Sequence, residues 1–184
     1  MRDNKLSPLV NGTRVRLLRR GDAALLSEAY VRNREHLAPW EPSRDDEFFT
    51  PSHQLNVIHS KLAQHAVRQE IPWVLLNVEG GERIIGAITL TGIVRGPFLN
   101  ANLGYWVDRD FNGRGIGSAA VSFAVDFARI ELGLHRVQAA TLVHNEASRK
   151  ILRRAGFQEI GVAPQYLKIA GTWEDHLLHQ LILH

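Results

Sequence analysis

A glycine-rich loop is the part of this sequence whose residue types and spacing are best suited to chemistry. In LGYWVDRDFNGRGIGSAA, residues 103–120, a stretch typical of a strand leads through Gly113, Gly115 and Gly117 into a helical pattern. Glycines leave consecutive backbone N–H groups uncovered, so these groups can converge on a phosphate at a helix N-terminus, where the dipole favours negative charge. With Arg114 as a nearby cation, the loop predicts a phosphate site; a glycine-rich turn without a ligand is the plain alternative.

Two common phosphate-binding patterns do not account for this loop. No Gly-Lys-Ser/Thr sequence occurs, which excludes a Walker loop. Gly115, Gly117 and Ala120 satisfy the G-x-G-x-x-A pattern of dinucleotide-binding domains. The next predicted strand, however, ends at Val143-His144 without the carboxylate that would bind a ribose, and the strands before the loop are predicted to be antiparallel.

Four helices are predicted around the loop from apolar residues at helical spacing. The first begins at Asp22 and the second at Ser52, each of these residues being the expected N-cap. The third covers residues 115–132 and is apolar on two faces, so it must be largely buried against a sheet. The fourth covers residues 145–155 and ends at Gly156.

Strands are predicted where β-branched and aromatic residues concentrate between turn residues. They cover residues 13–19, 73–78, 83–94, 102–107 and 137–143, followed by a hairpin turning near Ala170-Gly171. Gly80-Gly81 and Gly96-Pro97 separate the strands of an antiparallel meander. The order β-α-α-β-β-β-α-β-α-β-β predicts a mixed α/β fold with one mainly antiparallel sheet of about seven strands and four helices, in a single domain over residues 1–184.

The composition predicts a cytoplasmic globular protein. The 184 residues include no cysteine, which excludes disulfide frameworks, thiolate metal sites and a cysteine nucleophile. No apolar run approaches the ~20 residues of a membrane span, and the N-terminus lacks the apolar region of a signal peptide. The net charge of +3 is spread along the chain and does not predict specific nucleic-acid binding.

Acidic residues are concentrated in one short segment of the chain. Glu41, Asp45, Asp46 and Glu47 lie within seven positions of one another. They form either a solvated acidic loop or a rim that attracts a basic substrate.

The glycine loop resembles the pyrophosphate loop of the GCN5-related N-acetyltransferases (GNAT), whose pattern is Gln/Arg-x-x-Gly-x-Gly/Ala between the fourth strand and the next helix. Here the pattern runs from Asn112 to Gly117, with Asn112 where that superfamily usually has Gln or Arg. A second similarity is Asn145-x-x-Ser148 followed by Gly156-Phe157. Taken alone, Asn145 is a plain helix N-cap.

At a finer level the chain resembles the RimJ-like ribosomal-protein alanine N-acetyltransferases from about Asn11 to its end. The most specific match is HLAPWEP, residues 36–42, and further matches lie at residues 94–96, 103–105, 135–136 and 166–176. The resemblance implies acetyl-CoA as donor and direct transfer to the N-terminal α-amine, that of alanine, of a ribosomal or other basic protein. Two alternatives are a GNAT enzyme that acetylates a small-molecule amine and a non-catalytic acyl-CoA-binding or ribosome-associated factor. Both a monomer and a homodimer stay open.

The same resemblance implies which residues bind the donor. In GNAT proteins the fourth and fifth strands splay apart, the pantetheine arm pairs with the exposed strand edge, and a main-chain N–H polarises the thioester carbonyl. The donor-binding residues predicted in this way are Trp106, Val107, Asn112, Gly113, Arg114, Gly115, Ile116, Gly117, Ser118, Asn145 and Ser148.

For catalysis, the lack of both cysteine and a G-x-S-x-G turn indicates that the amine attacks directly. Ser148 lies on the same helix face as Asn145 and is predicted to donate a hydrogen bond to the departing sulfur; a surface serine without a role is the alternative. Glu41 is the preferred general base, with Tyr105 and Tyr166 in reserve. A structural role for Glu41, such as pairing with Arg44, is the alternative.

The acceptor is predicted to contact Trp40, Glu41, Asp45 and Tyr166. Because the N-terminus of a ribosomal protein is commonly rich in Lys and Arg, the acidic residues would steer it electrostatically. The nine histidines predict no metal site, since no H-E-x-x-H occurs and His176 and His179 would point to opposite faces of a strand.

Overall fold

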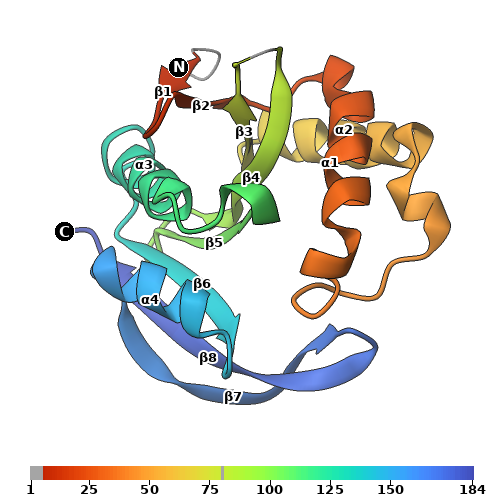
Figure 1. The fold of residues 1–184 in the computed structure, drawn as a ribbon. Helices are drawn as coiled ribbons and strands as arrows, with labels where there is room; N and C mark the ends of the chain where they lie inside the picture. The colour runs from red at the N-terminus through yellow and green to blue at the C-terminus, as the bar shows by residue number, and fades with distance from the viewer. Residues whose placement is uncertain (1–5, 80) are drawn as a thin grey trace.

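The computed structural model describes residues 6–79 and 81–184 of the chain. The described residues form four α-helices: α1 (Ala23–Leu37), α2 (Pro51–Ala66), α3 (Ile116–Ile130) and α4 (Glu146–Arg154). The strands are β1 (Ser7–Pro8), β2 (Thr13–Leu17), β3 (Glu70–Asn77), β4 (Arg83–Val94), β5 (Asn100–Val107), β6 (Arg136–Leu142), β7 (Gln158–Ile169) and β8 (Thr172–Ile182). Short 3₁₀ helices η1 (Arg20–Asp22), η2 (Asp46–Phe49) and η3 (Arg109–Phe111) join them (Figure 1).

All the strands belong to one sheet in the order β1-β2-β3-β4-β5-β6-β8-β7, and only the β5–β6 pair is parallel. The predicted α/β fold with a mainly antiparallel sheet is confirmed. The predicted number of strands is wrong by one, since eight occur in the described residues. The additional strand is β1, whose two residues pair with Arg14 and Val15 of β2 and are too few to show an alternating pattern.

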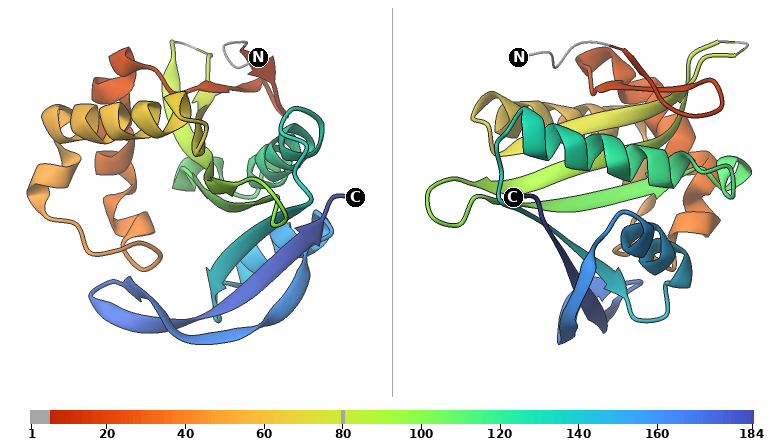
Figure 2. Two further views of the ribbon diagram at one scale, coloured as in Figure 1. Left: turned by 180° about the vertical axis from the view of Figure 1, so that it is seen from behind. Right: turned by 90° about the vertical axis from the view of Figure 1, so that its left-hand side faces the viewer.

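Helices cover both faces of the sheet (Figures 1 and 2). On one face, α3 and α4 pack over an apolar cluster that includes Ile88, Leu103, Ala120, Val121 and Leu152. On the other face, α1 and α2 pack over a smaller cluster that includes Leu26, Ala29, Ile58, Val74 and Ile84. Because side chains alternate along a strand, consecutive residues of β5 serve different faces: Tyr105 packs on the α3–α4 side and Trp106 on the α1–α2 side.

The centre of the sheet opens between β5 and β6. These strands pair only at Asn100–Asn102 with Arg136–Gln138. Beyond that point β5 stays paired with β4 as far as Val107, whereas β6 stays paired with β8 as far as Leu142. One edge of residues 103–107 is therefore free of strand partners, and β6 can be seen to diverge from β5 in the right-hand view of Figure 2. This is the separation that the GNAT resemblance implied.

Of the two predicted N-caps, Ser52 is wrong, whereas Asp22 has the predicted position but does not cap with its side chain. The N-cap of α2 is Thr50 rather than Ser52: the Thr50 hydroxyl accepts a hydrogen bond from the His53 N–H at 3.2 Å, and Pro51 takes the first helical position. Asp22 does precede α1, but its side chain does not cap the helix. Its buried carboxylate instead accepts two hydrogen bonds of 2.8 Å from the guanidinium of Arg16, because that buried cation needs an anionic partner.

The predicted hairpin turn is confirmed. Ile169 pairs with Thr172, and the two residues between them, Ala170 and Gly171, both have positive φ, as a two-residue turn requires. Of the predicted Gly80-Gly81 turn, Gly80 lies outside the described residues. In the described part of the chain, no helix has both the length and the hydropathy needed to cross a bilayer.

Candidate active site

The opening between β5 and β6 contains a cavity of about 190 Å³. Its walls come from five elements that are distant in sequence: β5, β6, the start of α4, the end of α1 with the residues after it, and the β7–β8 hairpin. The predicted site residues that line it are Trp40, Glu41, Tyr105, Trp106, Asn145 and Ser148. The fold thus brings most of the predicted catalytic residues to one place, which we call the central cleft.

The glycine loop lies at the end of β5. Gly113 and Gly115 have φ angles of 76° and 77°, which L-residues with a side chain rarely adopt, and a Cβ added at either would meet no atom within 4 Å. The first hydrogen bond of α3 runs from the Ala119 N–H to the Gly115 carbonyl, so the N–H groups of residues 116–118 have no acceptor within the helix. Open space beside uncovered donors fits a phosphate group.

A buried carboxylate holds the loop at its entry. Asp108 follows β5 directly and accepts hydrogen bonds from the Asp110 N–H at 3.0 Å and from the guanidinium of Arg83 at 3.0 Å. Burial opposes ionisation of Asp108, but hydrogen bonds from Asn33, Asp110 and Arg83 together outweigh it and lower its pKa. The Arg109 N–H also donates to the side chain of Asn33 in α1 at 2.9 Å. The loop therefore starts from a fixed point.

Arg114 and Asn112, two predicted donor-binding residues, are exposed on this loop. The guanidinium of Arg114 lies 5.0 Å from the centroid of the Phe111 ring, a cation–π distance that leaves the cation at the surface. Asn112, which stands where GNAT proteins usually have Gln or Arg, places its side-chain nitrogen 3.2 Å from Nε2 of His36. Asn112 therefore connects the glycine loop to the last turn of α1.

Two hydroxyl groups meet across the cleft. The Tyr105 hydroxyl of β5 lies 2.8 Å from the Ser148 hydroxyl of α4. Burial raises the pKa of Tyr105 to about 12, although the Ser148 hydrogen bond works against the shift, so the phenol stays protonated at neutral pH. Asn145 is the N-cap of α4, where its side chain accepts from the Ser148 N–H at 3.1 Å. The prediction that Asn145 is a helix N-cap is thus confirmed, and this contact fixes the position of Ser148.

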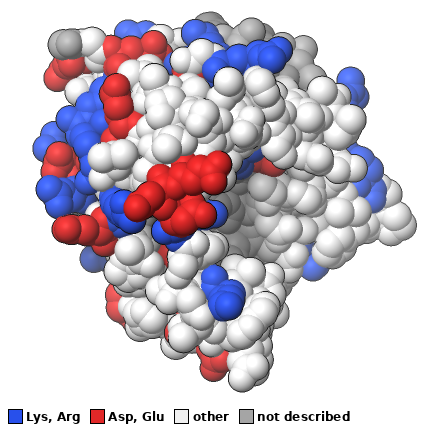
Figure 3. All heavy atoms as spheres, turned by 90° about the vertical axis from the view of Figure 1, so that its right-hand side faces the viewer, with Lys and Arg blue, Asp and Glu red and all other residues white. Residues whose placement is uncertain are grey.

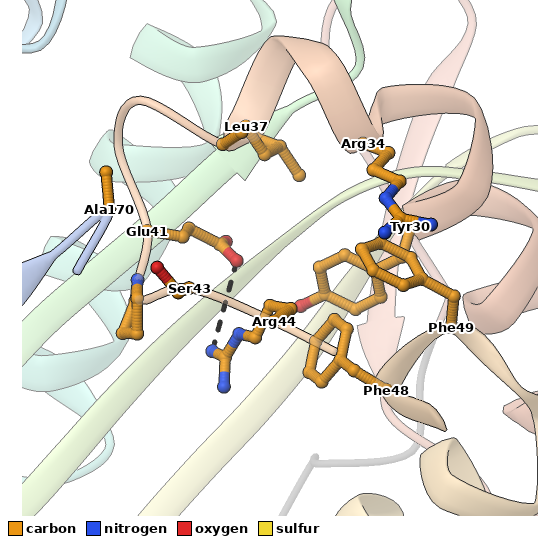
Figure 4. A pocket seen from close by; sticks show the side chains of 11 residues that line it. Tyr30, Arg34, Leu37, Glu41, Ser43, Arg44, Phe48, Phe49 and Ala170 are labelled. Atoms are coloured by element: carbon orange, nitrogen blue, oxygen red, sulfur yellow. Dashed lines mark ion pairs between the residues drawn. The ribbon is translucent and has the colours of Figure 1, made fainter. Parts of the chain in front are cut away.

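Glu41 stands where the central cleft meets a second cavity of about 300 Å³, which we call the α1–α2 cavity (Figure 4). Burial raises the pKa of the Glu41 carboxyl, and the nearby Arg44 guanidinium, 4.0 Å away, works in the opposite direction. The predicted structural alternative, pairing with Arg44, therefore occurs. At that distance the pair is loose, and it leaves the carboxylate directed into the cavity.

Sequence reasoning missed most of the wall of the α1–α2 cavity. Two stacked cations line it: Arg34 lies over the ring of Phe49 and Arg44 over the ring of Phe48, at 4.4 Å and 4.3 Å from the ring centroids. Tyr30 of α1 lies between these groups and Glu41 (Figure 4). Burial and the Glu41 charge both raise the pKa of Tyr30, so its hydroxyl stays neutral. Two consecutive phenylalanines in a polar connecting segment were the available sequence signal.

The remaining predicted residues are distributed around the cleft. Trp40 is partly exposed and stacks with His144 at 5.6 Å between ring centroids. The Trp106 indole contacts the Tyr30 ring at 5.1 Å, away from the α3–α4 side. Tyr166 does not line the central cleft itself but lines an adjoining cavity, and the two share wall residues such as Leu103 and Leu167. Asp45 lines neither the central cleft nor the α1–α2 cavity; its carboxylate accepts a hydrogen bond from the Phe48 N–H and caps η2.

Across residues 6–79 and 81–184, no cluster of three or more His, Asp or Glu side chains is arranged to hold a metal ion. His176 and His179 both belong to β8 and are both buried, and their odd spacing places them on opposite faces of the sheet.

Comparison with known proteins agrees with this geometry. The profile described as acetyltransferase (GNAT) domain matches residues 13–158. The chain belongs to the GNAT family. It is therefore an N-acetyltransferase, and this assignment confirms the resemblance inferred from the glycine loop.

Relatives of this GNAT enzyme include ribosomal-protein acetyltransferases. The [ribosomal protein uS5]-alanine N-acetyltransferase of Escherichia coli is 34% identical over 170 residues, which cover 91% of this chain and 86% of that protein. A ribosomal-protein-S5-alanine acetyltransferase from Vibrio fischeri has a structure that matches with a TM-score of 0.91 at 35% identity, over 97% of each chain. The Mycobacterium smegmatis RimJ structure, solved with CoA-disulfide, matches with a TM-score of 0.91 at 28% identity, over 98% of this chain and 88% of that one.

The raised pKa of Glu41 leads to a prediction about stability. The folded protein binds the Glu41 proton more tightly than the unfolded chain does, so protonation of Glu41 stabilises the folded state. This stabilisation is complete below the pKa that Glu41 has in the unfolded chain. It is lost as pH rises through the higher pKa that Glu41 has in the folded protein. At pH 7 the ionised carboxylate thus costs stability. Glu41→Gln is expected to raise Tm at pH 7, by about 2–4 °C for each kcal/mol gained. The Tm values of the two proteins are expected to converge at about pH 4.

Thermal unfolding of both proteins at the two pH values measures this difference. A lower Tm for Glu41→Gln at pH 7 would contradict it, because the Arg44 ion pair would then outweigh the effect of burial.

Proposed function

We propose that this enzyme transfers the acetyl group of acetyl-CoA directly to the N-terminal α-amine of a basic protein, with alanine as the terminal residue and a ribosomal protein as the natural acceptor. The observation that carries the proposal is the free edge of residues 103–107. At one end of this edge lies the exposed glycine loop, and on the other side of the cleft lies the half-buried carboxylate of Glu41. The names of the Escherichia coli and Vibrio fischeri relatives support this acceptor. A ribosomal acceptor also agrees with the cytoplasmic location predicted from the composition.

Acetyl-CoA fits the residues at the donor side. Three features would hold the diphosphate: the open space beside Gly113 and Gly115, the Arg114 cation, and the N–H groups of residues 116–118, which have no acceptor within the helix. We assign the backbone of Trp106 and Val107 to the pantetheine arm, because their edge has no strand partner. Bound there, acetyl-CoA supplies an activated acyl group, and the protein supplies orientation. The Mycobacterium smegmatis structure, solved with a CoA derivative, supports this choice of donor.

The acceptor enters, on this proposal, from the side of α1 and α2. Glu41 offers a negative charge to the α-ammonium, and Trp40 forms part of the cleft wall. Asp45, Asp46 and Glu47 are exposed in the connection between α1 and α2, on the side shown in Figure 3, where acidic side chains gather beside a hollow. We assign Tyr166 to the far end of the acceptor path, since its ring lies 5.6 Å from that of His176, a wall of the cleft.

The chemistry needs no protein nucleophile. An α-amine has a pKa near about 7.7–8.0, so a sizeable fraction is neutral at cellular pH and attacks once it is positioned. We assign to Glu41 the proton of the incoming ammonium. The hydroxyls of Tyr105 and Ser148 are both protonated. One of them donates to the other, and the hydroxyl whose hydrogen is not used within the pair would donate to the departing sulfur.

The glycine loop generates the first test of this proposal. Gly115→Ala is expected to weaken CoA binding by at least about tenfold, because one misplaced donor to an anion costs about 1.5–3 kcal/mol. Gly96→Ala is the matched control: Gly96 has a φ of 73° and equally open surroundings but lies in the turn before β5. Isothermal titration with CoA measures both variants. Equal losses in the two would attribute the effect to backbone strain and contradict the phosphate site.

The pair of hydroxyls generates a second test. Tyr105→Phe is expected to lower kcat by about 10²-fold or more with little change in CoA affinity, because it removes a proton donor but no phosphate contact. Since Tyr105 and Ser148 act as one unit, adding Ser148→Ala should cost little more. Release of free thiol from acetyl-CoA gives kcat for the single and double variants. Fully additive losses would separate the two residues mechanistically.

The acceptor itself is tested with synthetic peptides. The wild-type enzyme is expected to acetylate peptides that begin with alanine and carry several Lys or Arg residues faster than neutral peptides or polyamines. Glu47 makes no ion pair within the described residues, so Glu47→Lys should lower kcat/KM for basic peptides only, and less so at high salt. The exposed Glu131 at the end of α3 provides the charge-matched control, Glu131→Lys. Preferred turnover of polyamines would refute the protein acceptor.

A further inference from the structure

His176 of β8 is a titratable residue in the central cleft that the proposed chemistry does not yet use. Only 3% of its surface is exposed, and it lines the same cavity as Glu41, Tyr105 and Ser148. It approaches this cavity from the β7–β8 side, whereas Tyr105 and Ser148 come from β5 and α4. The cleft therefore contains an imidazole in addition to the predicted carboxylate and hydroxyls.

One hydrogen bond fixes the tautomer of this imidazole. Nδ1 of His176 lies 2.9 Å from the backbone carbonyl oxygen of Glu174. A carbonyl oxygen can only accept, so Nδ1 must carry the hydrogen, and in the neutral ring Nε2 must then hold a lone pair. Nδ1 is directed back to its own strand, which leaves Nε2 at the far end of the ring. No hydrogen bond within the described residues occupies Nε2.

The surroundings of the ring keep it in this orientation. The aromatic ring of Tyr166 lies 5.6 Å from it between centroids, and the backbone of β8 is held on both sides, by Leu142 of β6 and Ala163 of β7. A neutral imidazole with one nitrogen bonded to a carbonyl and the other free in a cavity is the usual arrangement of a histidine that accepts a proton.

Acetylation requires such an acceptor. The amine nitrogen starts as an ammonium with three hydrogens and ends as an amide with one, so it loses two protons. The N–C bond forms and the C–S bond breaks, the sulfur takes up one proton, and the other is released to solvent. Glu41 is assigned the first proton, which leaves before attack. The second leaves only after the nitrogen has bonded to the acyl carbon and has become strongly acidic, and so far no residue receives it.

We propose that Nε2 of His176 accepts the second proton of the acceptor nitrogen, which makes His176 a catalytic residue of the acetyl transfer. The proton then passes to the Tyr105–Ser148 pair as that pair donates to the sulfur, so His176 returns to its neutral form. This inference rests on the proposed function only in that the acceptor is an amine, whichever amine it is. Imidazole suits the step because it ordinarily changes charge between about pH 5 and 8, close to the conditions of the reaction.

The first experiment tests the tautomer and does not depend on turnover. Nitrogen-15 NMR of the histidine rings distinguishes a ring protonated at Nδ1 from one protonated at Nε2, and the His176→Asn variant identifies the His176 signal by its loss. We expect the neutral His176 ring of the wild-type protein to carry its hydrogen on Nδ1, facing the Glu174 carbonyl. A ring protonated at Nε2 would overturn the proposal, because no lone pair would then face the cleft.

The second experiment measures catalysis. His176→Asn keeps a side-chain N–H that can donate to the Glu174 carbonyl but removes the free ring nitrogen. It is expected to lower kcat by about 10²–10⁴-fold while the Kd for CoA stays unchanged. An unchanged kcat would overturn the proposal.

His179→Asn provides the matched control for loss of a buried histidine. His179 is 2% exposed on the same strand but points to the opposite face, toward the α4 side. Both variants are expected to lower Tm, and only His176→Asn is expected to lower kcat in the protein that remains folded. Comparable losses of kcat in both would assign the effect to disruption of β8 and overturn the catalytic role.

The choice of acceptor separates this proposal from the proposed function. Turnover is first measured for the wild-type enzyme with basic peptides, neutral peptides and small amines, and the best acceptor is used for the variants. If only small amines react, the protein acceptor is wrong while the test of His176 proceeds with those amines. If basic peptides react and His176→Asn retains full kcat, only the role of His176 is wrong.

Discussion

The early end of the pairing between β5 and β6 is the constraint on which the rest of this structure depends. Three residue pairs join the strands, and then each strand stays with its outer neighbour, β4 on one side and β8 on the other. An internal strand edge without partners is costly for a protein, because its N–H and C=O groups lose their hydrogen bonds. Here the edge faces a cavity, where a substrate with amide groups of its own can complete the pairing.

Substrate positioning follows from the elements that flank this opening. Asp108 fixes the end of β5, so the glycine loop begins at a defined place beside the opening. Asn145 caps α4 and thereby holds Ser148 against Tyr105. In the proposed direct transfer the amine itself is the nucleophile, so most of the rate enhancement would come from such fixed positions and few groups would need to be chemically activated. The buried polar contacts of the fold serve this positioning as much as they serve stability.

Local patterns in the sequence predicted those parts of the site that depend on consecutive residues. The glycine loop, the N-cap Asn145 and the hairpin at Ala170-Gly171 each require particular residue types at fixed spacing, and all three have the predicted local structure. The family resemblance predicted that Glu41 borders a substrate cleft, and in the structure Glu41 lines both the central cleft and the α1–α2 cavity. The fold class was predicted from the order in which strand-like and helix-like spacing of apolar residues alternate along the chain. The two residues of β1 are too few to show either spacing.

Contacts between distant segments could not be predicted in this way. The meeting of Tyr105 with Ser148 joins β5 to α4, and the α1–α2 cavity joins Tyr30 to Phe48 and Ala170. Asp22 is a similar case. Its position in the sequence favours a helix cap, but in the folded protein its carboxylate forms an ion pair with the buried Arg16 instead. His176 was considered as part of the family match and as a possible metal ligand, but not as a residue of the cleft. Sequence spacing predicts which face of a strand a residue occupies but not which cavity that face borders.

The last turn of α1 contacts both the glycine loop and the walls of the two cavities. His36 contacts Asn112 of the glycine loop, while Leu37 and the following Glu41 line the cleft and the α1–α2 cavity. A helix that moves as a rigid body transmits a displacement at one of these places to the other. A shift of this turn that favoured the binding of one substrate would therefore displace residues beside the other, and by thermodynamic linkage any resulting change in affinity would be equal in both directions.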